Sequence, residues 1–236
     1  MYEFMAQSLA QKNYYAKTLN AKKLYEVYQT KYPRVKKYFT EEIAFVMNQL
    51  HGTERMLELG AGYGRIMKEL AIHCKLIVGI DISEDNVTFG KEYLSDTHAK
   101  LIVMDAHQIN PERFEMSFDV VLCLQNALSA MKVEPFSYVE KIMDLLSPNG
   151  RAFISSYSEK FWPHRLDWFL EQAEKGLLGE IDLEQTKAGT IVGKDGFRAV
   201  TYTVEQLREI GKSSGYPYKV QEVDESSIFL IITKEV

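Results

Sequence analysis

The sequence of 236 residues contains few cysteines, no excess of basic residues and no long apolar run. Its two cysteines, Cys74 and Cys123, lie in apolar surroundings, which argues against a disulfide-built scaffold and predicts buried free thiols in a reducing compartment. No apolar stretch approaches the roughly 20 residues that a membrane helix needs, and the N-terminus lacks the apolar core of a signal peptide. We therefore expect a cytoplasmic protein without a membrane partner.

Basic residues are in deficit: 28 lysines and arginines stand against 33 acidic residues, a net charge of −5. Extended nucleic-acid binding needs concentrated positive charge, so no nucleic-acid partner is expected. The one notable basic cluster, Lys31 to Lys37, is interpreted as a solvated helix face rather than an RNA or membrane patch. Five scattered histidines and two separated cysteines lack the spacing of metal ligands, so we expect neither a metal site nor magnesium.

Strands and helices are predicted to alternate through one α/β domain, which suits the length and the 46% hydrophobic content. Strands are predicted at residues 55–59, 76–81, 100–104, 118–124, 150–155, 218–223 and 227–233. Helices are predicted at about 40–50, 64–73, 84–94, 131–146 and 204–214. The alternation indicates parallel pairing, whereas the short connection between the last two strands makes that pair antiparallel.

Two regions lie outside this alternation. Residues 1–52, rich in tyrosine, are expected to form an N-terminal helical cap, and residues 53–236 the main domain. Within the domain, residues 157–203 form an insert after the fifth strand, with a helix at 161–176 and a hairpin at 189–201. Insertions above the carboxyl ends of strands usually cover a substrate, so the insert is predicted to be a lid.

Three glycines, Gly60, Gly62 and Gly64, separate the first strand from the following helix. Glycine tolerates positive φ and lets a ligand approach the backbone. The spacing is G-x-G-x-G, and Arg65 stands where a dinucleotide fingerprint requires its last glycine. Glu58 places a carboxylate beside this turn, which disfavours a pyrophosphate and suits an ammonium or sulfonium ligand.

The segment Glu58-Leu-Gly-Ala-Gly-Tyr-Gly64 resembles motif I of the class I S-adenosylmethionine-dependent methyltransferases. Roughly the next hundred residues reproduce the order of the family's motifs. The resemblance implies S-adenosylmethionine as cofactor, with S-adenosylhomocysteine as product. It also implies a seven-stranded doubly wound sheet in the order 3-2-1-4-5-7-6 with an antiparallel last strand. A nicotinamide-dependent oxidoreductase is disfavoured by the glycine spacing and by the terminal hairpin.

The resemblance also implies positions for the cofactor. Asp81 would bind the ribose hydroxyls, although an acid there can also simply cap a helix. Ile82 would pack on the adenine, Asp105 would accept its amino group, and Gln125 would face the methionine moiety. The complete set of expected cofactor residues is Tyr15, Glu58, Gly60, Ala61, Gly62, Asp81, Ile82, Asp105, Ala106 and Gln125.

Residues of the insert and residues just after the fourth strand are predicted to bind the methyl acceptor and to transfer a proton. Asn126, Trp162 and Arg165 are the expected substrate-binding residues. The alternative for the pair Gln125 and Asn126 is that these amides only form a turn after the strand. His164 is the first candidate for a general base, because imidazole titrates near neutrality, and Tyr157 is the second. A surface role for His164 remains the alternative.

These features predict a methyltransferase acting on a small molecule, as a monomer or homodimer. The first alternative is a protein or RNA acceptor, which a positively charged groove beside the site would favour. The second is a non-catalytic module that binds S-adenosylmethionine, which a site without an acceptor cavity would favour. The absence of a Pro-Pro-aromatic sequence after Asn126 weakens a nucleobase acceptor.

Overall fold

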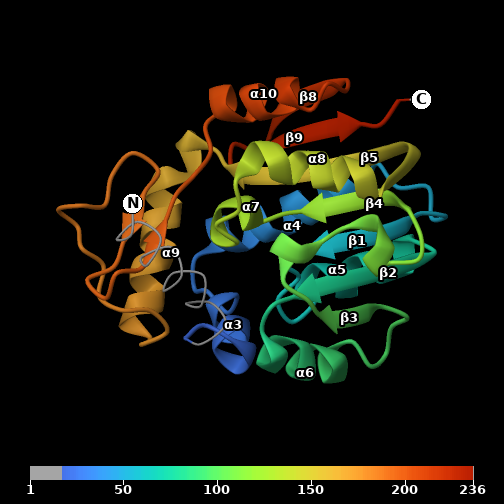
Figure 1. Ribbon diagram of the computed structural model, residues 1–236. Coiled ribbons are helices and arrows are strands. Elements are labelled where there is room, and N and C mark those ends of the chain that lie inside the picture. The colour runs from blue at the N-terminus through green and yellow to red at the C-terminus, as the bar shows by residue number, and fades with distance from the viewer. Residues whose placement is uncertain (1–17, 236) are drawn as a thin grey trace.

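A seven-stranded sheet forms the centre of the computed structural model, which describes residues 18–235 (Figure 1). Its order is β3-β2-β1-β4-β5-β9-β8, and β9 runs antiparallel to both of its neighbours. Because β8 and β9 are the sixth and seventh strands of this sheet along the chain, the predicted order 3-2-1-4-5-7-6 is confirmed. The strands are β1 (Arg55–Leu59), β2 (Leu76–Asp81), β3 (Lys100–Val103), β4 (Phe118–Cys123), β5 (Leu146–Tyr157), β8 (Tyr218–Val223) and β9 (Ser227–Thr233).

Helices cover both faces of the sheet. Alternate residues of the central strand β4 point to opposite faces, so Val121 and Cys123 pack with α8 (Pro135–Leu145) and α10 (Val204–Ser213). Val120 and Leu122 belong to the opposite cluster. That second layer contains α4 (Pro33–Met47), α5 (Arg65–Leu70) and α6 (Glu84–Tyr93). Cys74 and Cys123 are buried free thiols, as predicted.

Side chains cap the first turns of two helices. The Ser83 side chain accepts a hydrogen bond from the backbone nitrogen of Asn86 at the start of α6. Thr203 and Gln206 form a reciprocal capping box at the start of α10. The short 3₁₀ helices are η1 (Ala71–His73), η2 (Ala106–Gln108), η3 (Pro111–Arg113) and η4 (Glu159–Phe161).

Two predicted helices have different bounds in the structure. The helix predicted at 40–50 begins earlier, because Pro33 occupies its first turn, where a missing N–H is harmless. The helix predicted at 131–146 is divided into α7 (Ala127–Ala130) and α8. Lys132 has a left-handed φ of 55°, and Pro135 begins the second helix, so the chain turns between them.

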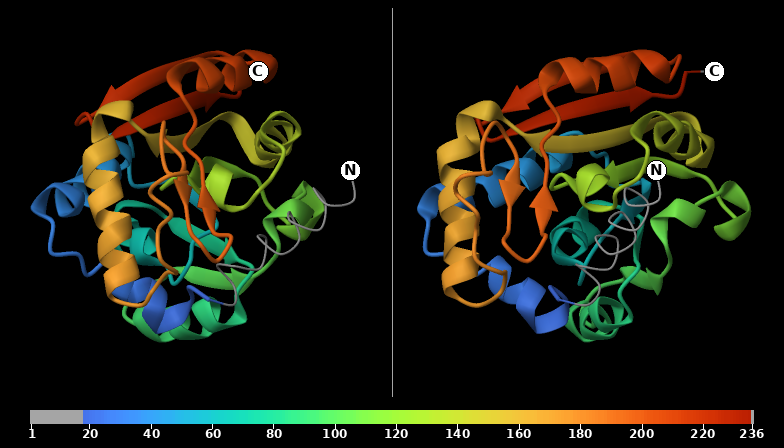
Figure 2. Two further views of the ribbon diagram at one scale, coloured as in Figure 1. Left: turned by 90° about the vertical axis from the view of Figure 1, so that its left-hand side faces the viewer. Right: turned by 60° about the vertical axis from the view of Figure 1, so that its left-hand side comes forward.

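The carboxyl ends of the parallel strands face α3 (Ala21–Val27) and the insert (Figure 1). The insert contains α9 (Trp162–Glu174) and a short hairpin of β6 (Ile191–Val192) and β7 (Arg198–Ala199), and Figure 2 shows these elements across this end of the sheet. The Trp168 indole donates a 2.9 Å hydrogen bond to the Val27 carbonyl, which joins α9 to α3. Within residues 18–235, no helix has both the length and the apolar character to cross a membrane.

Candidate functional site

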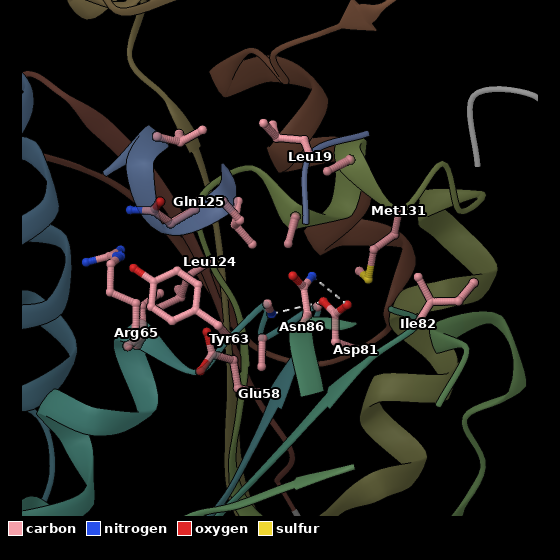
Figure 3. Close-up of a pocket in the computed structure, with 18 of the residues that line it drawn as sticks. Leu19, Glu58, Tyr63, Arg65, Asp81, Ile82, Asn86, Leu124, Gln125 and Met131 are labelled. Atoms are coloured by element: carbon pink, nitrogen blue, oxygen red, sulfur yellow. Dashed lines mark hydrogen bonds between the residues drawn. The ribbon is translucent and has the colours of Figure 1, made fainter. Parts of the chain in front are cut away.

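A cavity of about 210 Å³ lies where the carboxyl ends of the strands meet α3 and α9 (Figure 3). The sheet side is formed by the glycine loop and by the residues that follow β2, β3 and β4. The opposite side is apolar and comes from the cap and the insert. Residues that line that second side include Leu19, Leu24, Val27, Tyr28, Trp168, Phe169, Gln172 and Phe197.

The glycine loop has a backbone that only glycine adopts readily. Gly60, Gly62 and Gly64 have φ values of 70°, 57° and 87°. A Cβ added at Gly62 would lie 2.9 Å from the Leu24 side chain, so the loop also passes close to α3. The three glycines therefore let the loop backbone pass between α3 and the sheet at the edge of the cavity.

Asp81 connects this loop to the next helix. Its carboxylate accepts hydrogen bonds from the backbone nitrogens of Gly62 and Ser83, both at 2.9 Å, and from the Asn86 amide at 3.0 Å. Burial raises the pKa of Asp81, although these hydrogen bonds oppose the rise. Asn86 in turn accepts a hydrogen bond from the backbone nitrogen of Ala21, so the cap, Asp81 and the glycine loop are joined.

The remaining predicted residues at this end of the cavity surround its rim. Ile82 is 44% exposed and lines the cavity after β2. Asp105 and Ala106 line it after β3, and Asp105 accepts hydrogen bonds from the backbone nitrogen and Nδ1 of His107. An apolar side chain and a carboxylate thus follow two neighbouring strands and line the same cavity.

Glu58 and Arg65 lie at the other end of the cavity. Glu58 is 4% exposed, and burial raises its pKa to about 8, while Arg65 acts against the rise. The Arg65 guanidinium stacks on the rings of Tyr28 and Phe39, with its carbon 4.4 Å and 5.1 Å from their centroids. A buried acid and a stacked cation therefore face the same space.

Gln125 follows β4 and is fixed by a buried acid of α4. Its backbone nitrogen donates to Glu42 Oε1 and to Ser155 Oγ, and its Nε2 donates to Glu42 Oε2 at 2.8 Å. Glu42 is fully buried, and this burial raises its pKa against the effect of those hydrogen bonds. The second amide atom, Gln125 Oε1, is left for the cavity.

Several buried polar atoms of cavity residues have no hydrogen-bond partner in the described part of the chain. Such atoms are rare in folded proteins and call for an explanation such as a ligand or water. They include acceptors and donors, as a zwitterionic ligand requires, so the residues present fit an adenosyl sulfonium with an amino acid end. The atoms are Glu58 Oε2, Arg65 Nε, Arg65 Nη2, His107 Nε2, Gln125 Oε1 and Gln172 Nε2.

The predicted acceptor residues occupy other positions. Asn126 lines a smaller neighbouring cavity, where its amide donates to the Val200 carbonyl and accepts from Ser156. Arg165 is 1% exposed and donates to the carbonyls of Gly189 and Ala199 and to the Thr201 hydroxyl. Asn126 thus joins the insert to β5, whereas Arg165 joins α9 to the hairpin within the insert, a structural use that the sequence analysis did not predict for Arg165.

The two proposed proton-transfer residues separate in the structure. Tyr157 is buried and lines the main cavity, whereas His164 is exposed and is not among its lining residues. Trp162 is half-buried and likewise absent from the lining. Tyr15 lies outside the described residues. Of the two candidates, only Tyr157 therefore borders the cavity in this structure.

Sequence reasoning missed Glu42 and Gln172 and assigned Arg65 no role. Arg65 was visible as the residue that replaces the dinucleotide glycine, and its position directly after the loop could have indicated a ligand contact. Glu42 and Gln172 lie on helices with no motif of their own, and they reach the site only through tertiary packing. Among residues 18–235, no group of three or more potential acidic, histidine or cysteine ligands is arranged to hold a metal.

Comparison with known proteins agrees with this arrangement. A family model described as a methyltransferase domain matches residues 56–150. An uncharacterized methyltransferase of Schizosaccharomyces pombe is 31% identical over 109 residues, which is 42% of this chain and 37% of that protein. A ubiquinone biosynthesis O-methyltransferase of Aromatoleum aromaticum is 27% identical over 112 residues, 46% of each chain. The match thus spans less than half the length of these relatives.

A solved structure extends the likeness of the fold to almost the whole chain. The magnesium protoporphyrin IX methyltransferase from Synechocystis superposes with a TM-score of 0.62 and 13% identity, covering 97% of each chain. The match of the family model begins in β1 and includes the glycine loop and the turns after β2, β3 and β4 that line the cavity. The chain therefore contains a methyltransferase domain at residues 56–150, and its fold is that of the class I S-adenosylmethionine-dependent methyltransferases.

Proposed function

We propose that the protein transfers a methyl group from S-adenosylmethionine to a small-molecule acceptor. The observation that carries this proposal is the enclosure of the cavity between the glycine loop and an apolar wall from α3 and α9. A wall residue, Trp168, is hydrogen-bonded to α3, so the two covering elements hold each other in place. The apolar wall and the size of this space favour a small, largely apolar acceptor over a folded macromolecule. The name of one matched relative, for ubiquinone biosynthesis, agrees with such an acceptor.

The residues around the glycine loop would hold the donor. We propose that Asp81 accepts hydrogen bonds from the ribose hydroxyls. Its carboxylate has lone pairs in addition to those that accept from Gly62, Ser83 and Asn86. Ile82 would cover one face of the adenine, and Asp105 would accept its amino group. The left-handed loop at Gly60 and Gly62 would let the backbone pass close to the ligand.

When bound, S-adenosylmethionine supplies a methyl group activated by a positively charged sulfur. The protein's contribution is then alignment of the acceptor and exclusion of water. Trp168 and Phe169 would exclude water from above. Tyr157 would orient the acceptor, because burial raises the pKa of its phenol and keeps the hydroxyl protonated as a hydrogen-bond donor.

The test is a transfer assay with isotopically labelled donor and three separate acceptor pools: a low-molecular-weight metabolite extract, total protein and total RNA. Labelled product in the metabolite pool, absent with Asp81→Ala, supports the proposal. Label confined to protein or RNA would overturn the small-molecule acceptor. Calorimetric binding of S-adenosylhomocysteine without label in any pool would favour a non-catalytic binding module.

A further inference from the structure

Gln172 places an amide in a largely apolar wall of the cavity. It lies on α9 one turn after Trp168, and both residues line the cavity from the same face of the helix. Gln172 is 3% exposed, and its Nε2 has no hydrogen-bond partner in the part of the chain that the structure describes. An amide nitrogen buried in this way is unfavourable for folding unless a ligand or a water molecule pairs with it.

The position of Gln172 is fixed by its neighbours on α9. The preceding residue, Glu171, is buried and accepts hydrogen bonds from the Thr30 hydroxyl and from the Lys31 backbone nitrogen, the latter at 2.9 Å. The hydrogen bond from the Trp168 indole to α3 holds the same helix one turn earlier. The amide is therefore held beside the cavity before a ligand binds, which reduces the entropy that binding costs.

A water molecule is a poor partner for this amide. A buried water needs about two to four polar partners. The same wall instead offers apolar side chains, such as those of Leu24, Phe169 and Phe197. An oxygen atom of an apolar ligand can pair with Gln172 Nε2 while the rest of the ligand packs against these side chains. The wall therefore suits an apolar molecule that carries a hydrogen-bond acceptor.

The charges around the cavity indicate that this acceptor oxygen is neutral. Among residues 18–235, no charged side chain of α3 or of the insert lines the cavity. A carboxylate paired with one neutral amide would lose its hydration without a balancing charge on this wall. An ammonium group has no hydrogen to accept and cannot pair with Nε2, which only donates. A carbonyl oxygen satisfies the amide and brings no charge.

We propose that Gln172 selects the methyl acceptor by donating a hydrogen bond to a neutral oxygen, such as a carbonyl, on an otherwise apolar molecule. The inference rests on the proposed function and narrows its substrate class. Gln172 belongs to the insert, whereas Asp81 and the glycine loop lie on the sheet side of the cavity. Loss of the amide should therefore change the binding of the acceptor and leave the binding of the donor.

The experiment compares two probes, acetophenone and ethylbenzene, which differ in the carbonyl oxygen. NMR titration measures both affinities for protein saturated with S-adenosylhomocysteine, which occupies the donor site. The ratio of acetophenone affinity to ethylbenzene affinity should fall by about 3- to 10-fold in Gln172→Leu and in Gln172→Met, the range for a neutral hydrogen bond. Calorimetry should show less than about a threefold change in S-adenosylhomocysteine affinity. Glu174→Gln, an exposed change on the same helix, is the control and should keep the wild-type ratio.

Infrared spectroscopy gives a second measurement that needs no variant. The carbonyl stretch of acetophenone bound to the wild type should lie at a lower frequency than in cyclohexane, because a hydrogen bond weakens the carbonyl bond. An unshifted stretch, or no binding of acetophenone, would overturn the role of Gln172.

Two further results have distinct meanings. An unchanged affinity ratio in both Gln172 variants, with or without a loss of S-adenosylhomocysteine affinity, would also overturn the selection of the acceptor by Gln172. Failure of the wild type to bind S-adenosylhomocysteine would instead overturn the proposed function, and the role of Gln172 with it.

Discussion

Glu42 binds Gln125 through both the backbone and the side chain of that residue. Glu42 Oε1 accepts from the Gln125 backbone nitrogen at 3.1 Å, and Oε2 accepts from Nε2 at 2.8 Å. Gln125 has a left-handed φ of 56°, a conformation that costs a residue with a Cβ about 1–2 kcal/mol. The contact therefore stabilises an unfavourable backbone and directs the remaining amide oxygen to the cavity.

Replacing Glu42 with glutamine should disturb this arrangement. A glutamine at position 42 offers one oxygen and one NH₂ to donors at Gln125 and Ser155, so at least one donor is left unpaired. We expect the free energy of unfolding to fall by about 2 kcal/mol, measured by urea denaturation. The affinity for S-adenosylhomocysteine should also fall. Glu41→Gln, one residue earlier on α4, is the control, and equal behaviour of the two variants would contradict the positioning role of Glu42.

The raised pKa of Glu58 predicts a pH-dependent stability. In the folded protein this pKa is about 8, against 4.5 for an ordinary glutamate, so the folded state keeps the proton over a range in which the unfolded chain loses it. The contribution of the Glu58 proton to the free energy of unfolding is therefore complete below pH 4.5 and declines as the pH rises to about 8. Glu58→Gln lacks this titration and should gain stability relative to the wild type across that range, on the order of a few kcal/mol.

Urea denaturation of the ligand-free protein at pH 5, 6.5 and 8 measures this difference. Glu69→Gln, an exposed change on α5, should follow the wild type at every pH. Parallel pH curves for the wild type and Glu58→Gln would show that the buried carboxyl titrates normally.

Asp81→Asn should weaken cofactor binding and loosen the glycine loop together. The substitution replaces one acceptor oxygen with an NH₂, which cannot accept from the Gly62 nitrogen or from a ribose hydroxyl. We expect about a 10- to 100-fold loss of affinity for S-adenosylhomocysteine by calorimetry, the range for hydrogen bonds to a charged group. Asp85→Asn, in the first turn of α6 and bonded to Asn20, serves as control. Unchanged affinity in Asp81→Asn would remove Asp81 from the ribose role.

Features carried by neighbouring residues were predictable from the sequence. The glycine loop, the Ser83 cap and the capping box at Thr203 depend on contacts within a few residues, so their signals are local. The strand order was predictable because the motifs of the resembled family extend over the alternating strands and helices, and that family has a characteristic strand order. The break before Pro135 also has a local signal, since proline favours the first turn of a helix over its interior.

Roles that depend on packing between distant elements were not predictable. Glu42 meets Gln125 across 83 positions of the chain, and Asn126 meets Val200 across 74. Arg165 was predicted to bind the substrate, yet backbone carbonyls of the insert accept its hydrogen bonds. Residue type alone cannot distinguish these uses, since both satisfy the same guanidinium.

Arg165→Met should release the insert hairpin. The change removes the guanidinium donors to Gly189, Thr201 and Ala199, and the Gly189 carbonyl keeps only its hydrogen bonds from Thr201. We expect a loss of about 2–4 kcal/mol in unfolding free energy, typical for breaking a buried polar network. Limited proteolysis with mass analysis should show faster cleavage between residues 189 and 201. Unaltered cleavage there would show that the hairpin is held by its apolar contacts instead.

His164→Ala, on the same helix α9, is the matched control for Arg165→Met. It also tests the hypothesis that His164 is a general base. His164 is exposed and does not line the cavity, so its loss should change neither hairpin cleavage nor kcat by more than about twofold. Tyr157→Phe, by contrast, removes a hydroxyl from the cavity and should lower kcat with the donor affinity retained. Removal of a true general base reduces the rate by about 100-fold or more. A loss of that size in His164→Ala, with cofactor binding intact, would require α9 to turn this imidazole toward the acceptor during the reaction.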